Sequence, residues 1–147
     1  MNPKTQLENA LKDAMRAKDE VRKSAIRMAL ASIKLAEVEA RHELDDTALF
    51  TVLQKEIKAH KETISEAQRA GRQDMVSEKE AEIAILQEFL PQPLAPEALE
   101  FLVREVIVEV EAKTPADVGK VMKVLLPRLQ GRATASEASQ VVRKLLQ

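Results

Sequence analysis

The strongest limit on how this chain can fold comes from two prolines separated by a single residue, in the segment Leu90-Pro91-Gln92-Pro93-Leu94. Each proline lacks a backbone N–H and clashes with the preceding turn, so a helix cannot continue through both. We expect a short, stiff and extended connector over residues 91–95. The pattern therefore predicts two bodies, one over residues 1–90 and the other over residues 96–147.

The composition indicates that both bodies are helical. The 147 residues include only three glycines and three phenylalanines, with no tryptophan or tyrosine. Strand-rich folds need turn glycines and favour aromatic residues, whereas this chain takes its apolar residues mostly from Ala, Leu, Val and Ile. The sequence predicts an all-α protein, with an antiparallel bundle of about four helices before the connector and a three-helix bundle after it.

The second predicted helix, from Asp19 to about Arg41, has an apolar side and a basic side. Apolar residues at helical spacing predict one buried stripe, made of Val21, Ala25, Met28, Ala29, Ser32, Leu35 and Ala36. Basic residues occupy the opposite side, namely Lys23, Arg27, Lys34 and Arg41. This basic side is either a solvated outer face or a binding stripe.

Two segments after the connector allow more than one interpretation. Pro96 suits the first position of a helix, but the β-branched run Val106-Ile107-Val108 leaves a strand open as an alternative. The next helix is expected from Ala116 to Leu126, ending around Pro127, and Thr134 is expected to open the last helix.

Charge and hydropathy set an expectation for the compartment. The formal net charge is −1, there is no cysteine, and neither an apolar N-terminal segment nor an 18-residue apolar run occurs. These features predict a cytoplasmic protein with no membrane partner.

Catalytic and metal-binding patterns are weak in this sequence. His60 has no Glu three residues before it, so the repeated Glu-x-x-His pattern of helical di-metal sites is missing, although Glu78 and Glu82 form an i,i+4 carboxylate pair. No serine lies in a glycine-flanked elbow, and the glycines are too far apart for a phosphate-cradling loop. The sequence predicts no metal, no cofactor and no catalytic residues, with His60 in contact with a Glu at the edge of the core.

The clearest positive signal is the charge of residues 115–147. This segment holds six basic and two acidic residues, a net charge of +4. Its glycines would let a backbone approach a phosphate, and the scarcity of aromatic residues disfavours base stacking. The candidate nucleic-acid-binding residues are Lys120, Lys123, Arg128, Arg132, Arg143, Lys144, Gly119 and Gly131. The alternative is a solvated positive end without a ligand.

Several separated segments resemble the YqeY proteins, which are grouped with the C-terminal region of GatB, the B subunit of the tRNA-dependent amidotransferase. The matching segments are VRKSAIRM at 21–28, LQKEI at 53–57, AGRQD at 70–74, ILQEFLP at 85–91, DVGKVM at 117–122, Pro127 and GRA at 131–133. Two departures stand out, since Thr134-Ala135 replaces the usual Asp-Gly and His60 stands where Arg is common.

The resemblance implies a fold and a function. It implies two α-helical bundles, and in the amidotransferase the corresponding tail recognises tRNA while other domains perform the chemistry. It also implies a label of carbon–nitrogen ligase with glutamine as amido-N-donor. Our leading hypothesis is an accessory tRNA-binding or tRNA-associated module. The alternatives are participation in amide transfer beside a catalytic partner, or an adaptor that docks on an amidotransferase or another translation-linked protein.

Overall fold

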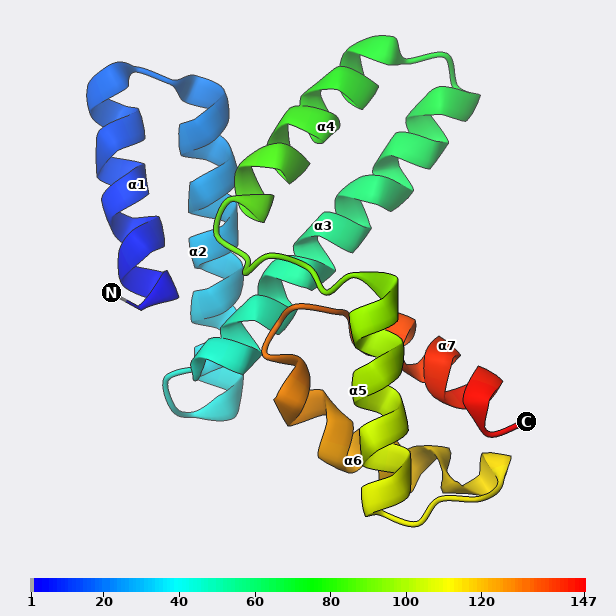
Figure 1. The fold of residues 1–147 in the computed structure, drawn as a ribbon. Helices are drawn as coiled ribbons and strands as arrows, with labels where there is room; N and C mark the ends of the chain where they lie inside the picture. The colour runs from blue at the N-terminus through cyan, green and yellow to red at the C-terminus, as the bar shows by residue number, and fades with distance from the viewer. Residues whose placement is uncertain (1) are drawn as a thin grey trace. The chain divides into compact units, whose positions relative to one another are not determined.

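The computed structural model describes residues 2–147, and this range contains seven α-helices, one 3-10 helix and no strand (Figure 1). The all-α prediction is therefore confirmed. The chain divides into two compact units, of which the first ends at Leu90 and the second spans Pro91–Gln147. No helix in the described range is long and apolar enough to cross a membrane.

The N-terminal unit consists of two helical hairpins that pack on each other. Its helices are α1 (Pro3–Ala17), α2 (Glu20–Ala40), α3 (Asp46–Arg69) and α4 (Gln73–Gln87). Helix α1 packs on α2 and α3 on α4, while α2 also contacts α3 and α4 (Figure 1). Its core consists of aliphatic side chains, with Leu7, Ile26, Ile33, Leu53 and Leu86 among the most deeply buried.

Side-chain caps define where these helices begin. The carboxylates of Asp19 and Asp45 accept the backbone N–H groups of Arg22 and Ala48, at 3.1 and 2.8 Å. Such caps satisfy N–H groups that have no partner inside the helix.

The helix ends depend on left-handed residues that are mostly not glycine. Gly71, which follows α3, has φ +69°, a conformation that favours glycine after a helix. Within the described residues, four residues other than glycine also take positive φ, at values from 50° to 63°: Lys18, Arg41, Glu111 and Gln130. Each costs about 1–2 kcal/mol relative to a right-handed conformation, so packing around these turns must offset that cost.

The buried face of α2 differs from the predicted stripe. The structure buries Ala25, Ile26, Ala29 and Ile33, whereas Val21, Met28 and Leu35 are exposed. Residues seven apart share one side of a helix, and the exposed three lie on the side next to Ala25 and Ala29. The predicted stripe combined two adjacent faces, and only packing against α1, α3 and α4 decides which of them is covered.

The end of α4 is fixed to α2 by one side chain. The Arg22 guanidinium pairs with the Glu88 carboxylate at 2.7 Å and lies 5.8 Å from the centre of the Phe89 ring. Helix α4 ends at Gln87 rather than at the expected Leu90, and turns carry the chain to the prolines.

The C-terminal unit is a three-helix bundle. It consists of α5 (Pro96–Glu109), the 3-10 turn η1 (Pro115–Asp117), α6 (Val118–Leu129) and α7 (Ala135–Leu145). Every pair of the three α-helices is in contact. The strand alternative for 106–108 is wrong, because Leu99, Val103 and Val106 recur at helical spacing and are buried together in the core.

Pro127 lies inside α6 and does not end it, which corrects the expected boundary at Leu126. Helix α6 continues to Leu129 and ends where Gln130 takes a left-handed conformation. A proline in the last turn removes only one backbone hydrogen bond, so the gain from burying Leu125 and Leu129 in the core can offset it.

Hydrogen bonds tie the proline connector to the C-terminal unit. Arg132 Nε donates to the carbonyl oxygen of Gln92 at 2.8 Å, and the Leu94 N–H donates to the carbonyl oxygen of Arg132 at 2.9 Å. Residues 92–94 are thus held against the α6–α7 loop.

We expect the two units to unfold independently, because each has its own apolar core. Leu125→Ala should destabilise the C-terminal unit by about 2–5 kcal/mol, since it leaves a cavity at a fully buried position. Hydrogen exchange of the full chain should then accelerate across residues 91–147 and stay unchanged across residues 2–90. Leu53→Ala is the reciprocal control, and acceleration of both units by either variant would contradict the prediction.

Candidate nucleic-acid interface

Lys120 and Lys123 lie on the outer face of α6. The buried side of this helix carries Val121, Leu125 and Leu129, so the two lysines point away from the core. Both are exposed, and residues three apart on a helix are neighbours, with Cβ atoms about 5–6 Å apart. Neither lysine forms a salt bridge with any residue of the described chain.

The two glycines of the candidate interface have different structural roles. Gly131 has φ +76° in the turn after α6, a conformation that favours glycine. Gly119 lies in the first turn of α6, where φ is not positive, and a Cβ placed on it would meet no atom within 4 Å. Neither the backbone nor the packing of this unit requires glycine at position 119.

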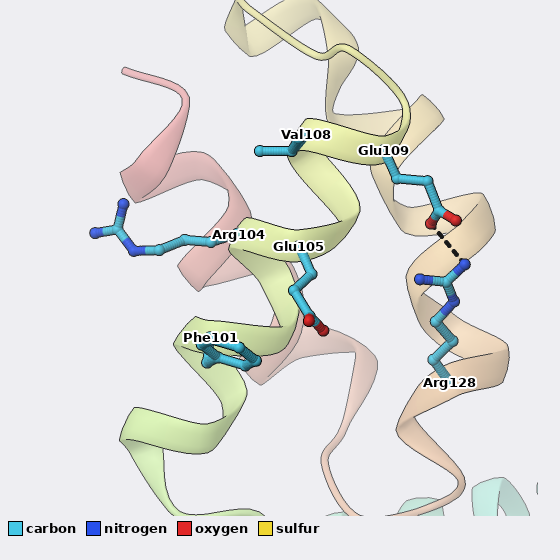
Figure 2. A pocket seen from close by; sticks show the side chains of 6 residues that line it. All are labelled: Phe101, Arg104, Glu105, Val108, Glu109 and Arg128. Atoms are coloured by element: carbon cyan, nitrogen blue, oxygen red, sulfur yellow. Dashed lines mark ion pairs between the residues drawn. The ribbon is translucent and has the colours of Figure 1, made fainter.

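Arg128 is turned toward α5. Its guanidinium pairs with the Glu109 carboxylate at 2.5 Å, across the space between α5 and α6 (Figure 2). This pair has no signature in the sequence, because the two residues belong to different helices. The pair reduces the charge that Arg128 can offer to a phosphate.

A shallow, open depression of about 580 Å³ adjoins this ion pair and is lined by Phe101, Arg104, Glu105, Val108, Glu109 and Arg128. Its side chains do not converge, since Arg104 extends away from Glu109 and Arg128 (Figure 2). Most of the lining residues lie on an exposed face of α5. The depression lacks the enclosed set of polar groups that is typical of a small-molecule site.

The remaining basic residues fall into two groups. Arg132, in the α6–α7 loop, uses Nε to hold Gln92, so part of its guanidinium serves the fold. Arg143 and Lys144 are exposed in the last turn of α7, where cations interact favourably with the helix dipole. Among the predicted basic residues, Lys120, Lys123, Arg143 and Lys144 therefore form no salt bridge within the described chain, unlike Arg128.

Acidic and basic residues are separated within the C-terminal unit. Helix α5 has four glutamates and one arginine, a net charge of −3, whereas residues 115–147 carry +4. Because α5 and α6 turn their outer faces in different directions around the core, the positive surface belongs to the α6–α7 side.

Asp117 organises the start of α6. One carboxylate oxygen accepts the backbone N–H groups of Lys113 and Thr114, at 2.9 and 3.1 Å, and Thr114 completes a capping box. These two hydrogen bonds stabilise the charged form and hold the pKa of Asp117 below its ordinary value, and Lys120 nearby acts in the same direction.

The other polar cluster is buried in the N-terminal unit. His60 Nε2 on α3 lies 3.4 Å from Glu82 Oε2 on α4, and Lys79 Nζ lies 3.1 Å from the same oxygen. The predicted contact of His60 with a glutamate is confirmed. Within residues 2–147 no three His, Cys, Asp or Glu side chains are arranged to hold a metal ion, so we assign this cluster to the joint between α3 and α4.

Comparison with known sequences identifies the family. A sequence model described as Yqey-like protein matches residues 4–146, nearly the whole chain. The chain belongs to the YqeY-like protein family. This finding confirms the resemblance seen in the separated motifs. Thr134, where the family pattern differs, caps α7 by accepting the Glu137 N–H at 3.0 Å.

Three curated relatives of this YqeY-like chain are named "Altered inheritance of mitochondria protein 41, mitochondrial". The Lachancea thermotolerans protein is 37% identical over 113 residues, which cover 75% of this chain and 60% of that protein. The Pyrenophora tritici-repentis protein is 32% identical, with 89% of this chain and 73% of that protein covered. A Saccharomyces cerevisiae protein is 34% identical, with 58% and 47% covered. The match thus spans between about half and three quarters of these relatives.

The expectation of a cytoplasmic protein is contradicted by these names. All three relatives are called mitochondrial, which points to mitochondria rather than the cytoplasm. The expectation depended on hydropathy, which detects apolar signal peptides and membrane spans. Mitochondrial transit peptides are amphipathic and rich in Arg and Ser, so hydropathy does not report on that destination.

Gly119→Ala should stabilise the protein, because alanine is the better helix former by about 0.5–1 kcal/mol and its methyl group meets no atom. Gly131→Ala is the matched control and should destabilise by about 1 kcal/mol, since its φ is positive. Urea unfolding followed by circular dichroism measures both changes. A destabilised Gly119→Ala variant would show that the fold itself requires this glycine.

Asp117 should make stability depend on acid pH. Its pKa is lower in the folded protein than in the unfolded chain, because the folded carboxylate accepts the two backbone N–H groups. Its contribution is therefore present above about pH 4 and is lost as the pH falls through the folded value. Asp117→Ala should lower the urea midpoint at pH 7, and its difference from wild type should shrink toward pH 3. A difference that stays constant with pH would contradict this assignment.

Proposed function

We propose that this YqeY-like chain is an accessory tRNA-binding module and that the outer face of α6 contacts the RNA backbone. The observation that carries the proposal is the combination of Gly119, Lys120 and Lys123. Both lysines are exposed and outside any salt bridge of the described chain, beside a glycine that the fold does not require. Two ammonium groups next to an uncrowded backbone suit a phosphodiester.

The charge distribution supports the same face. A net charge of −1 over the whole chain gives little general attraction to RNA, so binding depends on the local charge of +4 in residues 115–147. Aromatic side chains are scarce, which favours recognition of backbone and shape over stacking on bases. The resemblance to the tRNA-recognising tail of GatB selects tRNA among structured RNAs.

Partners follow from the same proposal. An accessory RNA-binding module is expected to work beside an amidotransferase or another translation-linked protein. Any amide transfer would be performed by that partner.

The test is a titration of nuclease-treated full-length protein with a bulk tRNA pool, at low and at moderate salt. Lys120→Glu/Lys123→Glu should lower the affinity at least about tenfold, and affinity should fall with salt because phosphate contacts release counterions. The lost contacts should also make the salt dependence of the variant shallower by about 0.7–0.9 per lysine.

Lys55→Glu/Lys58→Glu is the matched control, because it reverses the charge of two exposed lysines, also three apart, on α3. The control should retain at least half of the affinity, which separates a local contact from a change in overall charge. If wild type does not bind, or if both variants weaken equally, the proposal is wrong.

A further inference from the structure

An unpartnered apolar stripe runs along the exposed side of α2. Its large members are Val21 and Met28, each 47% exposed, Leu35 at 60% and Val38 at 62%. Val21, Met28 and Leu35 are seven residues apart, and Val38 follows three residues later. We call these four residues the α2 stripe. Large exposed apolar side chains aligned on one side of a helix are candidates for a site of association.

Basic residues follow one edge of the α2 stripe. Arg27, Lys34 and Arg41 are also seven residues apart and exposed, so they form a line parallel to the apolar one. Among the described residues, none of the three takes part in a salt bridge. Their charges are therefore available to an external group.

The other edge of the α2 stripe borders a small groove between α2 and α3. Leu35, Ala36 and Val52 supply its apolar lining. Its floor is held by a hydrogen bond from the Ser32 hydroxyl to the Glu56 carboxylate, which ties α2 to α3. The stripe thus lies on a surface supported from below by packed helices.

The seven-residue spacing favours a helix as the occupant. Residues seven apart return to the same side after two turns, which lets a second helix lie along the first with side chains interdigitated. Amphipathic helices commonly dock on such surfaces through apolar residues at i, i+3, i+4 and i+7. The basic line then selects a helix with acidic residues on the facing flank.

We propose that α2 is a docking surface for an acidic amphipathic helix of another protein. Its apolar residues would cover the α2 stripe, and its carboxylates would face Arg27, Lys34 and Arg41. This surface belongs to the N-terminal unit, whereas the lysines of α6 belong to the C-terminal unit. The test of the docking surface therefore does not depend on RNA binding.

A second copy of this chain fits the surface less well. In an antiparallel pair centred on α2, Val21 would meet Val38 of the other copy, but the basic line would meet no acidic line. The exposed acids beside the stripe are Glu20, which pairs with Lys23 at 2.9 Å, and Glu39. Because these two lie near opposite ends of α2, they do not complement three evenly spaced cations.

The probe is a designed, fluorescently labelled peptide of about 21 residues, with leucine at its a and d positions and glutamate on the flank that would face Arg27, Lys34 and Arg41. Titrated with full-length protein, it should bind, and added salt should weaken the complex. The same peptide with lysine in place of glutamate should bind at least about tenfold more weakly. Arg27→Glu/Lys34→Glu should reverse this preference between the two peptides.

Met28→Ser/Leu35→Ser should lower the affinity at least about tenfold without unfolding the protein, because both side chains are exposed. The matched control is Phe101→Ser/Val108→Ser, which removes two exposed apolar residues, also seven apart, from α5 in the other unit. The control should bind as wild type does.

Four results would overturn the proposal. They are no binding of the glutamate peptide, equal loss in the α5 control, self-association that Met28→Ser/Leu35→Ser abolishes, and a stronger response to vesicles of phosphatidylcholine and phosphatidylglycerol than to the peptide. The third result would assign the stripe to a dimer of this chain, and the fourth would assign it to a lipid surface.

Discussion

Burial of aliphatic side chains in two separate cores is the interaction on which the rest of this protein depends. The C-terminal core is built from Leu, Val and Ala alone, within a unit of 57 residues from Pro91 to Gln147. Units of this size bury a smaller share of their surface than larger domains and are only marginally stable. Small contributions at the edges therefore matter, such as the Asp117 capping box and the hydrogen bonds of Arg132 to the connector.

The basic residues of the C-terminal unit are of two kinds, those that help to stabilise it and those that do not. Arg128 and Arg132 are used partly in holding α5, the connector and the α6–α7 loop together. Lys120 and Lys123 form no salt bridge within the described chain, and Gly119 has no structural reason to be glycine. Exposed cations that the fold does not use are the candidates for recognition of a ligand.

Much of the fold could be predicted from the sequence because its signals are local. The paired prolines act on the few residues around them, and the scarcity of glycine and aromatic residues disfavours strands throughout the chain. The errors arose where tertiary packing decides. Which side of α2 is covered, and whether α6 continues past Pro127, depend on neighbouring helices that the sequence pattern does not specify.

The candidate interface was less predictable for a related reason. Charge counts include every basic residue of residues 115–147, but they cannot show that Arg128 pairs with Glu109 or that Arg132 binds the Gln92 carbonyl. The sequence did not predict the exposed α2 stripe, because apolar residues at helical spacing on this helix were expected to be buried in the core. A docking surface differs from a buried face in being exposed in the folded chain. The periodicity of apolar residues does not show which faces are exposed.

The charge separation in the C-terminal unit has one more consequence. Between Pro91 and Gln147 the net charge is only +1, from eight basic and seven acidic residues, yet α5 is negative and the α6–α7 segment is positive. The C-terminal unit therefore has a large electric dipole moment although its net charge is almost zero. A polyanion would attract it weakly at a distance but would rotate it on approach, bringing α6 forward and turning the glutamates of α5 away.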